Sequence, residues 1–544
     1  MRLVAMGAMM VAAATAADAT PPGFPARASA VLASAAPADG PGIVAVVSEN
    51  GRVVWRGAAG KANLATGAPL APASLFRYAS ISKQFTAALV LKYVEDGRLG
   101  LDDDLGKLLP AETPEAWHKV TVRQLLNHTS GIPSYTSKPG FMAEANTARA
   151  ITTRQLIDVT RDMPMDFAPG TQFRYNNTGY VLLSAIVEKL SGKPWYAALR
   201  ERITGPLGLT SIRCGCEPGP AVVESYTGGN RPSQKIDMTV PSGAGALVGT
   251  AEDLARWAAA LHGGKVVKPA SYQAMITPAM PAGATEKYGF GLSLGDVRGL
   301  AAIGHNGGIP GFSTESIYVP SKKLFVAALA NSDSGAVNPG IAARRLLAEA
   351  AGIPFPELKA MPTDLRTLEP LFGVYSGAGG QRRFFARDGK LYTQRADGAR
   401  VEAYWAGGDR FFYGPDSLSY FAVATGADGK PVMTFHPNGA LAGETLARTG
   451  PVPPEAAAAP LTPAQLDRLA GSYAFGPATM TIARSGAGLT AQLTGQPPIA
   501  LDSIGPNEFR TVGVDARLVF EEETGKLVRV VLHQNGRTIP FARQ

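Results

Sequence analysis

Residues 76–87 of the chain read FRYASISKQFTA, a segment that holds a serine three positions before a lysine. The segment lies where a turn is expected to lead into an apolar helix that runs from Lys83 to Glu95 and stops at Gly97. Residues three apart share one face of a helix, so the Ser80 hydroxyl and the Lys83 amine can meet. A helix N-terminus also offers unpaired N–H groups to an oxyanion. The segment therefore predicts a serine nucleophile that is activated without a Ser-His-Asp triad.

A Ser-x-x-Lys pattern carries little weight by itself. In a chain of 544 residues with this composition, about one such pattern is expected by chance. The alternative interpretation is a solvent-facing lysine one turn inside an ordinary helix. Two further segments favour the catalytic interpretation.

The first of these segments is Phe173-Arg174-Tyr175-Asn176-Asn177, which follows an Ala168-Pro169-Gly170 turn. In an extended backbone Tyr175 and Asn177 point the same way. Beside a protonated Lys83 the pKa of Tyr175 is expected to fall, so that its phenolate takes the Ser80 proton and returns it to a leaving group. Asn177 would hold Lys83 and the substrate amide. The alternatives are an interface tyrosine and a turn-forming asparagine.

The second segment is Gly304-His305-Asn306-Gly307-Gly308. Its glycines would let a substrate approach the edge of a strand closely. The backbone N–H of Gly308 could join that of Ser80 to form an oxyanion hole. The alternative is a simple hairpin turn.

Taken together, the three segments resemble the penicillin-recognising serine hydrolases, which include class C β-lactamases, D,D-carboxypeptidases, esterases and D-aminopeptidases. That family carries Ser-x-x-Lys, then Tyr-x-Asn, then Lys-Thr-Gly or His-x-Gly, and the resemblance spans residues 40–350. It implies an acyl-enzyme mechanism with neither metal nor organic cofactor. The roles that it implies are Ser80 as nucleophile, Lys83 and Tyr175 as general-base pair, Asn177 as positioning residue, and His305 and Gly307 as the third element.

The third element helps to rank the activities within that family. A lysine there binds the substrate carboxylate in β-lactamases, whereas His305 is mostly neutral at pH 7. The resemblance therefore favours a D-aminopeptidase-like hydrolase of short D-amino-acid peptides, amides or esters. An aminopeptidase needs a carboxylate for the substrate amine, and Asp502 and Asp515 are candidates. The alternatives are a carboxylesterase or weak β-lactamase on the same residues, and a non-catalytic scaffold that binds cell-wall fragments.

The chain is expected to contain three folded parts. Residues 25–355 form an α+β, β-lactamase/transpeptidase-like domain in which distant segments build one antiparallel sheet beside a helical subdomain. β-Rich runs around Asn50-Gly51 predict a hairpin. Residues 367–450 and 463–544 repeat one pattern 98 positions apart, with Tyr375 matching Tyr473, and predict two small antiparallel β-barrels.

Location and partners follow from the N-terminus, the cysteines and the charge. Residues 1–19 are typical of a signal peptide, which predicts a periplasmic or secreted protein without stable membrane insertion. Cys214 and Cys216 would close so small a ring that a structural bridge is not expected. The net charge of +8 is dispersed, which argues against nucleic acid as a partner. The expected partner is a small molecule or short peptide, and the sequence leaves the oligomeric state open.

Overall fold

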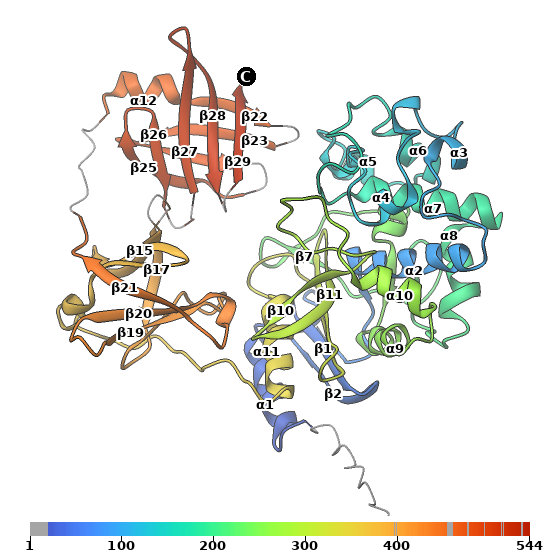
Figure 1. The fold of residues 1–544 in the computed structure, drawn as a ribbon, viewed down its shortest axis with the longest axis horizontal. Coiled ribbons are helices and arrows are strands. Elements are labelled where there is room, and N and C mark those ends of the chain that lie inside the picture. The colour runs from blue at the N-terminus through green and yellow to red at the C-terminus, as the bar shows by residue number, and fades with distance from the viewer. Residues whose placement is uncertain are drawn as a thin grey trace, which may run out of the picture.

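The computed structural model describes residues 20–544 except 396–397, 399, 454–460, 476–477, 494–495, 513, 515 and 535–536. The predicted signal peptide at 1–19 therefore lies outside the described residues. The described chain forms one sheet-and-helix domain and two barrels, with both barrels to the left of the first domain in Figure 1. This is the α+β, β-lactamase/transpeptidase-like fold that the sequence predicts.

A six-stranded antiparallel sheet lies at the centre of the first domain. Its order is β10-β11-β12-β13-β1-β2, so the N-terminal hairpin pairs with strands almost 300 positions later. The strands are β1 (Ile43–Glu49), β2 (Arg52–Ala59), β10 (Ser293–Val297), β11 (Leu300–Ile309), β12 (Phe312–Val319) and β13 (Leu324–Ala330). Asn50 and Gly51 have φ of 50° and 77°, the left-handed values that a tight hairpin turn requires, so the predicted hairpin is confirmed.

Helices cover both faces of this sheet, which explains why β1 is apolar at successive positions. Ile43, Ala45 and Val47 pack with α1 (Phe24–Ser34) and α11 (Pro339–Ala350) on one face. Val44 and Val46 belong to the larger core on the other face. Figure 1 places α1 and α11 together beside the sheet and α2–α10 on its other side.

The helical side contains the helix predicted from Lys83 to Glu95, observed as α2. The observed helices are α2 (Ser82–Glu95), α3 (Leu105–Leu108), α4 (Val122–Leu126), α5 (Glu144–Thr147), α6 (Thr153–Asp158), α7 (Asn177–Ser191), α8 (Trp195–Leu199), α9 (Ala251–His262) and α10 (Pro269–Ile276). Short strands connect them: β3 (Lys61–Asn63), β4 (Ala68–Pro69), β5 (Phe76–Arg77), β6 (Arg213–Cys214), β7 (Tyr226–Thr227), β8 (Arg231–Pro232) and β9 (Leu247–Gly249).

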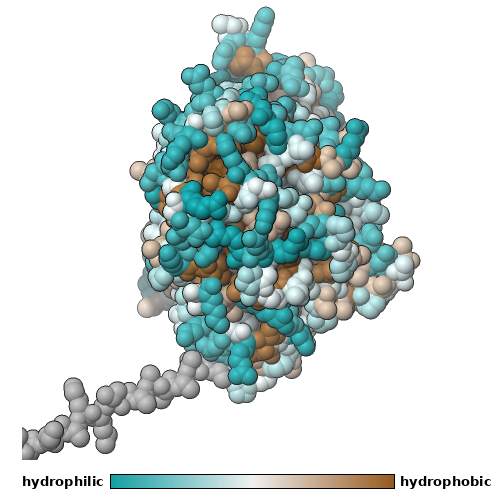
Figure 2. Space-filling view, turned by 90° about the vertical axis from the view of Figure 1, so that its right-hand side faces the viewer, coloured by the Kyte–Doolittle hydropathy of each residue, from teal (hydrophilic) through white to brown (hydrophobic). Residues whose placement is uncertain are grey.

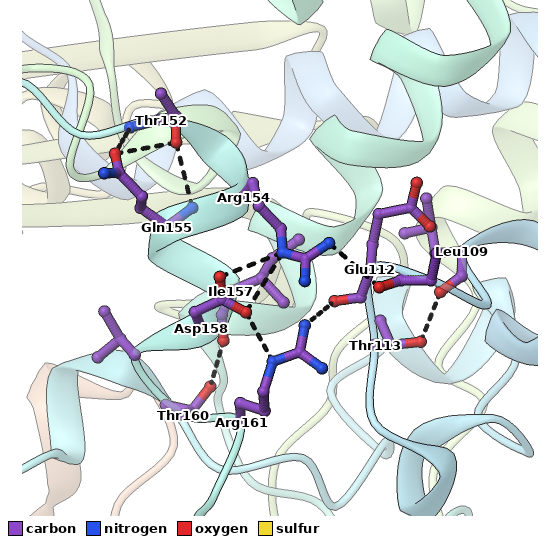
Figure 3. Close-up of polar contacts among 12 residues, drawn as sticks. Leu109, Glu112, Thr113, Thr152, Arg154, Gln155, Ile157, Asp158, Thr160 and Arg161 are labelled. Carbon is purple, nitrogen blue, oxygen red and sulfur yellow. Dashed lines mark hydrogen bonds and ion pairs between the residues drawn. The ribbon is translucent and has the colours of Figure 1, made fainter.

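Polar contacts fasten α6 to the loop after α3, as Figure 3 shows. Arg154 and Arg161 both pair with Asp158, and their remaining guanidinium nitrogens donate to the carbonyls of Ala111 and Glu112. Thr152 caps the start of α6. The face of the molecule in Figure 2 is mostly hydrophilic, with apolar side chains scattered between polar ones.

The two C-terminal barrels each close from eight antiparallel strands. The first contains β14 (Gly373–Gly377), β15 (Gly380–Arg387), β16 (Lys390–Arg395), β17 (Arg400–Trp405), β18 (Arg410–Phe412), β19 (Tyr420–Thr425), β20 (Pro431–His436) and β21 (Glu444–Gly450). After α12 (Pro463–Leu469), the second contains β22 (Gly471–Phe475), β23 (Ala478–Ser485), β24 (Gly488–Leu493), β25 (Ile499–Gly505), β26 (Glu508–Thr511), β27 (Ala516–Glu523), β28 (Lys526–Gln534) and β29 (Arg537–Arg543).

One hydrogen bond reproduces the sequence repeat in both barrels. Tyr375 donates its hydroxyl to the Leu371 carbonyl, and Tyr473 donates to the Leu469 carbonyl at 2.6 Å. Both tyrosine rings are buried in their barrel cores. The matching positions therefore have the same structural role.

Two connections hold the three parts together. Arg298, in the β10–β11 turn, donates to the Gly439 carbonyl of the first barrel at 2.7 Å and stacks on Phe355. Between the barrels, Arg400 forms an ion pair with Asp502. Asp502 is thus engaged by a barrel arginine rather than presented as a free carboxylate, and Asp515 lies outside the described residues.

Cys214 and Cys216 form a disulfide, so the expectation of no bridge is wrong. The chain turns sharply after β6 and brings the two Cα atoms to 5.1 Å, within the ordinary range for a disulfide. Among the described residues no helix is long and apolar enough to cross a membrane. Nor does the described part of the chain gather three or more histidine, cysteine or acidic side chains into a metal site.

Candidate active site

Ser80 lies in a 3-10 turn (Ala79–Ile81) directly before α2. Ala79 has a φ of 49°, a left-handed value that is strained for a residue with a side chain. Neighbouring strands hold the turn in place: Tyr78 donates its N–H to the Leu247 carbonyl at 2.9 Å, and the Thr314 hydroxyl donates to the Tyr78 carbonyl at 3.0 Å. These hydrogen bonds thus fix the backbone of the turn that contains Ser80.

Lys83 lies one helical turn after Ser80 and is completely buried. Its Nζ atom is 3.2 Å from Ser80 Oγ, 2.8 Å from Asn177 Oδ1 and 2.8 Å from the Ala244 carbonyl oxygen. Burial lowers the pKa of Lys83 well below its usual value of 10.5, because an ammonium ion is poorly solvated there. The environment therefore favours the neutral amine.

Tyr175 is hydrogen-bonded through its hydroxyl to the Ser80 side chain. The residue is 38% exposed, and Lys83 Nζ lies 4.7 Å from the centroid of its ring. Desolvation around the hydroxyl raises the pKa of Tyr175, and its hydrogen bond with Ser80 only partly opposes that rise. The expectation of an easily formed phenolate is therefore not met, because desolvation outweighs the hydrogen bond with Ser80.

Asn177 begins α7, and the preceding Asn176 caps that helix by accepting the Gly179 N–H at 2.7 Å. The Asn177 side chain has its orientation fixed from both ends. Its Oδ1 accepts from Lys83, and its Nδ2 donates to the Thr136 hydroxyl at 3.3 Å. The Tyr-x-Asn segment is thus brought to the Ser-x-x-Lys segment.

His305 is buried and has both ring nitrogens hydrogen-bonded. Its Nδ1 lies 2.5 Å from the Asn306 carbonyl oxygen, which can only accept, so Nδ1 carries the proton. Its Nε2 then accepts from the Tyr288 hydroxyl at 2.9 Å. Burial, together with the nearby Lys83, lowers the pKa of His305 to about 3. The ring is therefore neutral and in one tautomer at physiological pH.

Gly307 explains why β11 can lie against the Ser80 turn. A Cβ built there would fall 2.4 Å from the Tyr78 carbonyl oxygen and 2.3 Å from Thr314 Oγ1. β10 pairs with β11 only as far as Gly304, so residues 305–309 are free of β10 along that edge. Gly308 is exposed there, with open space at its own Cβ position.

Two cavities border β11 at different positions along this strand. The larger, about 1620 Å³, is bordered by Tyr175, His305 and Asn306. Its charged lining residues are Arg174, Glu286, Lys287 and Asp296. The smaller, about 650 Å³, is bordered by Gly308, Phe312 and Asp333. His305 and Asn306, before Gly307, thus line one cavity, and Gly308, after it, lines the other.

The structure brings together Ser80, Lys83, Tyr175 and Asn177, with His305 and the two glycines at the β11 edge. Sequence reasoning missed the Ala244 carbonyl and Tyr288, both of which make direct contacts in the site. A backbone carbonyl leaves no residue signature, whereas Tyr288 begins a Tyr-Gly-Phe-Gly run that marks a turn. His128 was also missed as a neighbour: it is buried, and its ring centroid lies 4.4 Å from that of Tyr175.

The chain is similar to several known proteins. Residues 32–351 match the Beta-lactamase protein family. Penicillin-binding protein 4 of Amycolatopsis lactamdurans is 31% identical over 350 residues, which span 59% of this chain and 90% of that protein. A D-aminopeptidase of Gluconobacter oxydans is 29% identical over 61% of this chain and 63% of its own length. The solved D-stereospecific amidohydrolase from Streptomyces sp. is 29% identical, with a TM-score of 0.51 over 60% of this chain and 99% of that one.

Proposed function

Because the chain belongs to the Beta-lactamase family and is a serine hydrolase of the peptidase or esterase type, we propose that it hydrolyses short D-amino-acid peptides, amides or esters through an acyl-Ser80 intermediate. The proposal assigns catalytic roles to Ser80, Lys83, Tyr175 and Asn177. It assigns the oxyanion hole to the backbone N–H groups of Ser80 and Gly308.

The observation that carries the proposal is the environment of the Lys83 amine. Two of its three close neighbours are carbonyl oxygens, on Asn177 and Ala244, and these can only accept hydrogen bonds. They engage both hydrogens of a neutral amine, which leaves its lone pair for the third neighbour, Ser80 Oγ. A buried amine with a lowered pKa is suited to accept the serine proton.

Acylation then follows from these positions. Lys83 takes the hydroxyl proton as Ser80 Oγ bonds to the substrate carbonyl carbon, and the carbonyl oxygen becomes an oxyanion. The N–H groups of Ser80 and Gly308 stabilise that charge. As the tetrahedral intermediate collapses, Tyr175 donates its proton to the leaving nitrogen or oxygen and recovers one from Lys83. The neutral tyrosine, whose pKa is raised, is suited to act as this donor.

Deacylation reverses the roles. Water attacks the acyl-Ser80 ester, gives up one proton to the Tyr175–Lys83 pair, and releases the acid with Ser80 protonated again. Each cycle consumes one water molecule and cleaves one amide or ester bond. No metal or organic cofactor enters it.

The substrate class rests on two supports. Neutral His305 offers no cation for a substrate carboxylate at the third element, which disfavours efficient β-lactam hydrolysis. Two of the similar proteins are a D-aminopeptidase and a D-stereospecific amidohydrolase. The second candidate is an esterase on the same residues, since the proposed chemistry serves an ester as well as an amide.

We also propose that the protein is exported to the periplasm or beyond the cell. The sequence of residues 1–19 supports export. The Cys214–Cys216 disulfide adds support, because disulfides persist chiefly in oxidising compartments. Fractionation of the native cells, followed by immunodetection, tests this; a protein confined to the cytosol would refute it.

The activity is tested by hydrolysis of D-alanine p-nitroanilide, its L-isomer, its N-acetyl derivative and p-nitrophenyl acetate, with Ser80→Ala as control. The expected result is turnover of the free D-amine in preference to the other anilides, lost in the variant. Ester turnover without any amide turnover would move the function to esterase. Turnover that survives in Ser80→Ala would refute the mechanism.

A further inference from the structure

We propose that Asp333 binds the α-ammonium group of the substrate's acyl residue, so that the enzyme selects substrates with a free amine. The inference rests on the proposed function, because it assumes a substrate whose carbonyl carbon is attacked by Ser80. It assigns a ligand to the smaller cavity, and it adds a specificity residue to the site.

The direction in which the substrate lies follows from the leaving group. That group must receive a proton, and the proposed donor, Tyr175, borders the larger cavity. The acyl half must therefore extend to the other side of the reacting carbonyl, past Gly308. Gly308 borders the smaller cavity, so the acyl residue and its amine lie there.

The smaller cavity holds one ionisable side chain. Its lining residues are Met142, Thr227, Gln234, Gly308, Ile309, Pro310, Phe312, Ser313 and Asp333, and Asp333 alone among them carries charge. The apolar members suit a small side chain, whereas a single carboxylate suits a single cation. At about 650 Å³ the cavity has room for one amino-acid residue.

Asp333 is held in place yet keeps acceptor capacity. Its Oδ2 accepts the N–H of Gly311, in the β11–β12 turn, at 2.8 Å, and its own N–H donates to the Tyr226 carbonyl. Within the described chain no hydrogen bond or ion pair engages Oδ1, and the residue is exposed. A carboxylate with one oxygen fixed and one open is suited to a charge-assisted hydrogen bond from an ammonium group.

Other carboxylates near the site are less suited to this role. Asp296 and Glu286 border the larger cavity, on the side of the leaving group, together with Arg174 and Lys287. Asp502 is paired with Arg400 between the barrels. Asp333 is therefore the carboxylate that lies on the acyl side of the proposed substrate orientation.

The test measures binding without turnover. Calorimetry gives the Kd of D-alanine p-nitroanilide and of its N-acetyl derivative for the Ser80→Ala protein, with and without Asp333→Asn. Asparagine keeps an oxygen for the Gly311 N–H, and the thermal unfolding midpoint checks that the fold is retained. The expected result is a tenfold or greater weakening for the free amine alone. In Ser80→Ala that affinity should also fall as pH rises past the amine's pKa of about 8, and Asp333→Asn should abolish this dependence.

Asp296→Asn is the matched control. Asp296 also accepts the N–H of a hairpin glycine, Gly299, at 3.0 Å, but it borders the opposite cavity. It should change the Kd of the free amine less than twofold. The inference is overturned if Asp333→Asn leaves the Kd of the free amine unchanged in the Ser80→Ala protein, or weakens the amine and its N-acetyl derivative equally. It is also overturned if Asp296→Asn weakens the free amine as much as Asp333→Asn does, or if the amine does not bind the Ser80→Ala protein. Failure of the proposed function appears separately, as a wild-type enzyme that binds the amine but cleaves only esters.

Discussion

Lys83 Nζ lies 2.8 Å from Asn177 Oδ1, although 94 positions separate the two residues in the chain. The contact joins the first turn of α2 to the first turn of α7, and both helices are anchored in the same core. Asn177 Oδ1 and the Ala244 carbonyl oxygen accept hydrogen bonds from the Lys83 amine and so fix its orientation. The remaining position on the nitrogen then faces Ser80 Oγ. The site therefore depends on helix packing as much as on the residues themselves.

Replacing Lys83 with arginine tests whether a neutral amine is required. A guanidinium keeps the positive charge but does not lose its proton in proteins, so it cannot accept one from Ser80. We expect kcat/KM for p-nitrophenyl acetate to fall by about 10²–10⁴. Lys92→Arg, on the same helix and paired with Glu95 at 3.2 Å, should retain activity. An active Lys83→Arg enzyme would contradict the assignment of the base.

The activity should depend on pH through the same lysine. Its pKa is lowered well below 10.5, so the amine is neutral over a range in which an exposed lysine is charged. As pH falls through the lowered pKa, the amine is protonated and the rate must fall. The measurement is kcat/KM against pH with p-nitrophenyl acetate, which carries no ionisable group of its own. A rate that rises only above pH 10 would mean that Lys83 is an ordinary lysine.

Stability should also fall in acid because buried histidines resist protonation. Burial lowers the pKa of His262 and of His305 to about 3, and lowers that of His128 well below 6.5. Unfolded histidines bind protons near pH 6.5, so the stabilisation is complete above that pH and is lost as pH falls towards 3. Each residue contributes a slope of up to about 1.4 kcal/mol per pH unit in that window.

His262 allows this expectation to be measured away from the catalytic residues. It stacks on Tyr318 at 3.9 Å between ring centroids, and its Nδ1 lies 2.9 Å from the Tyr272 hydroxyl. Urea unfolding of His262→Asn at several pH values should give a shallower loss of stability between pH 6.5 and 4 than the wild type. Identical slopes would indicate that His262 titrates normally in the folded protein.

Gly307 and Gly308 form a matched pair for testing the approach of β11 to the Ser80 turn. In Gly307→Ala the new methyl would lie 2.4 Å from the Tyr78 carbonyl oxygen, so the strand or the turn must move. We expect a lower thermal unfolding midpoint and at least a hundredfold lower activity. Gly308→Ala meets no atom within 4 Å, and its unfolding midpoint should match the wild type. Equal midpoints in both variants would contradict the close packing.

Much of the site was predictable because its key spacings are local. Ser80 and Lys83 lie three apart at a helix start, and the Asn50-Gly51 turn specifies its hairpin. The barrels were predictable from the repeat, since Tyr375 and Tyr473 keep one hydrogen bond to the residue four positions earlier. In each case the physical cause lies within a few residues of the motif.

The remaining features arise from contacts between distant segments. The partnership of Lys83 with the Ala244 carbonyl spans 161 positions and involves no particular side chain at 244. Likewise, the upward shift of the Tyr175 pKa depends on burial, which the Tyr-x-Asn motif does not encode. The Cys214–Cys216 bridge depends on a backbone turn that the spacing alone did not reveal.

Tyr288 provides the last test, because its hydroxyl is the donor that occupies His305 Nε2 at 2.9 Å. In Tyr288→Phe that buried nitrogen loses its donor, so the ring is held only at Nδ1, by the Asn306 carbonyl, and its orientation is less tightly fixed. We expect about tenfold lower kcat/KM and altered titration of His305, read from the ¹³C shifts of a protein labelled at histidine.

A matched control comes from Tyr272, whose hydroxyl also lies 2.9 Å from a histidine nitrogen, His262 Nδ1, but away from the active site. Tyr272→Phe should leave both the activity and the His305 signal unchanged. If Tyr288→Phe lowers the activity without any change in the His305 signal, the tyrosine acts through packing, and the role assigned to its hydrogen bond is wrong.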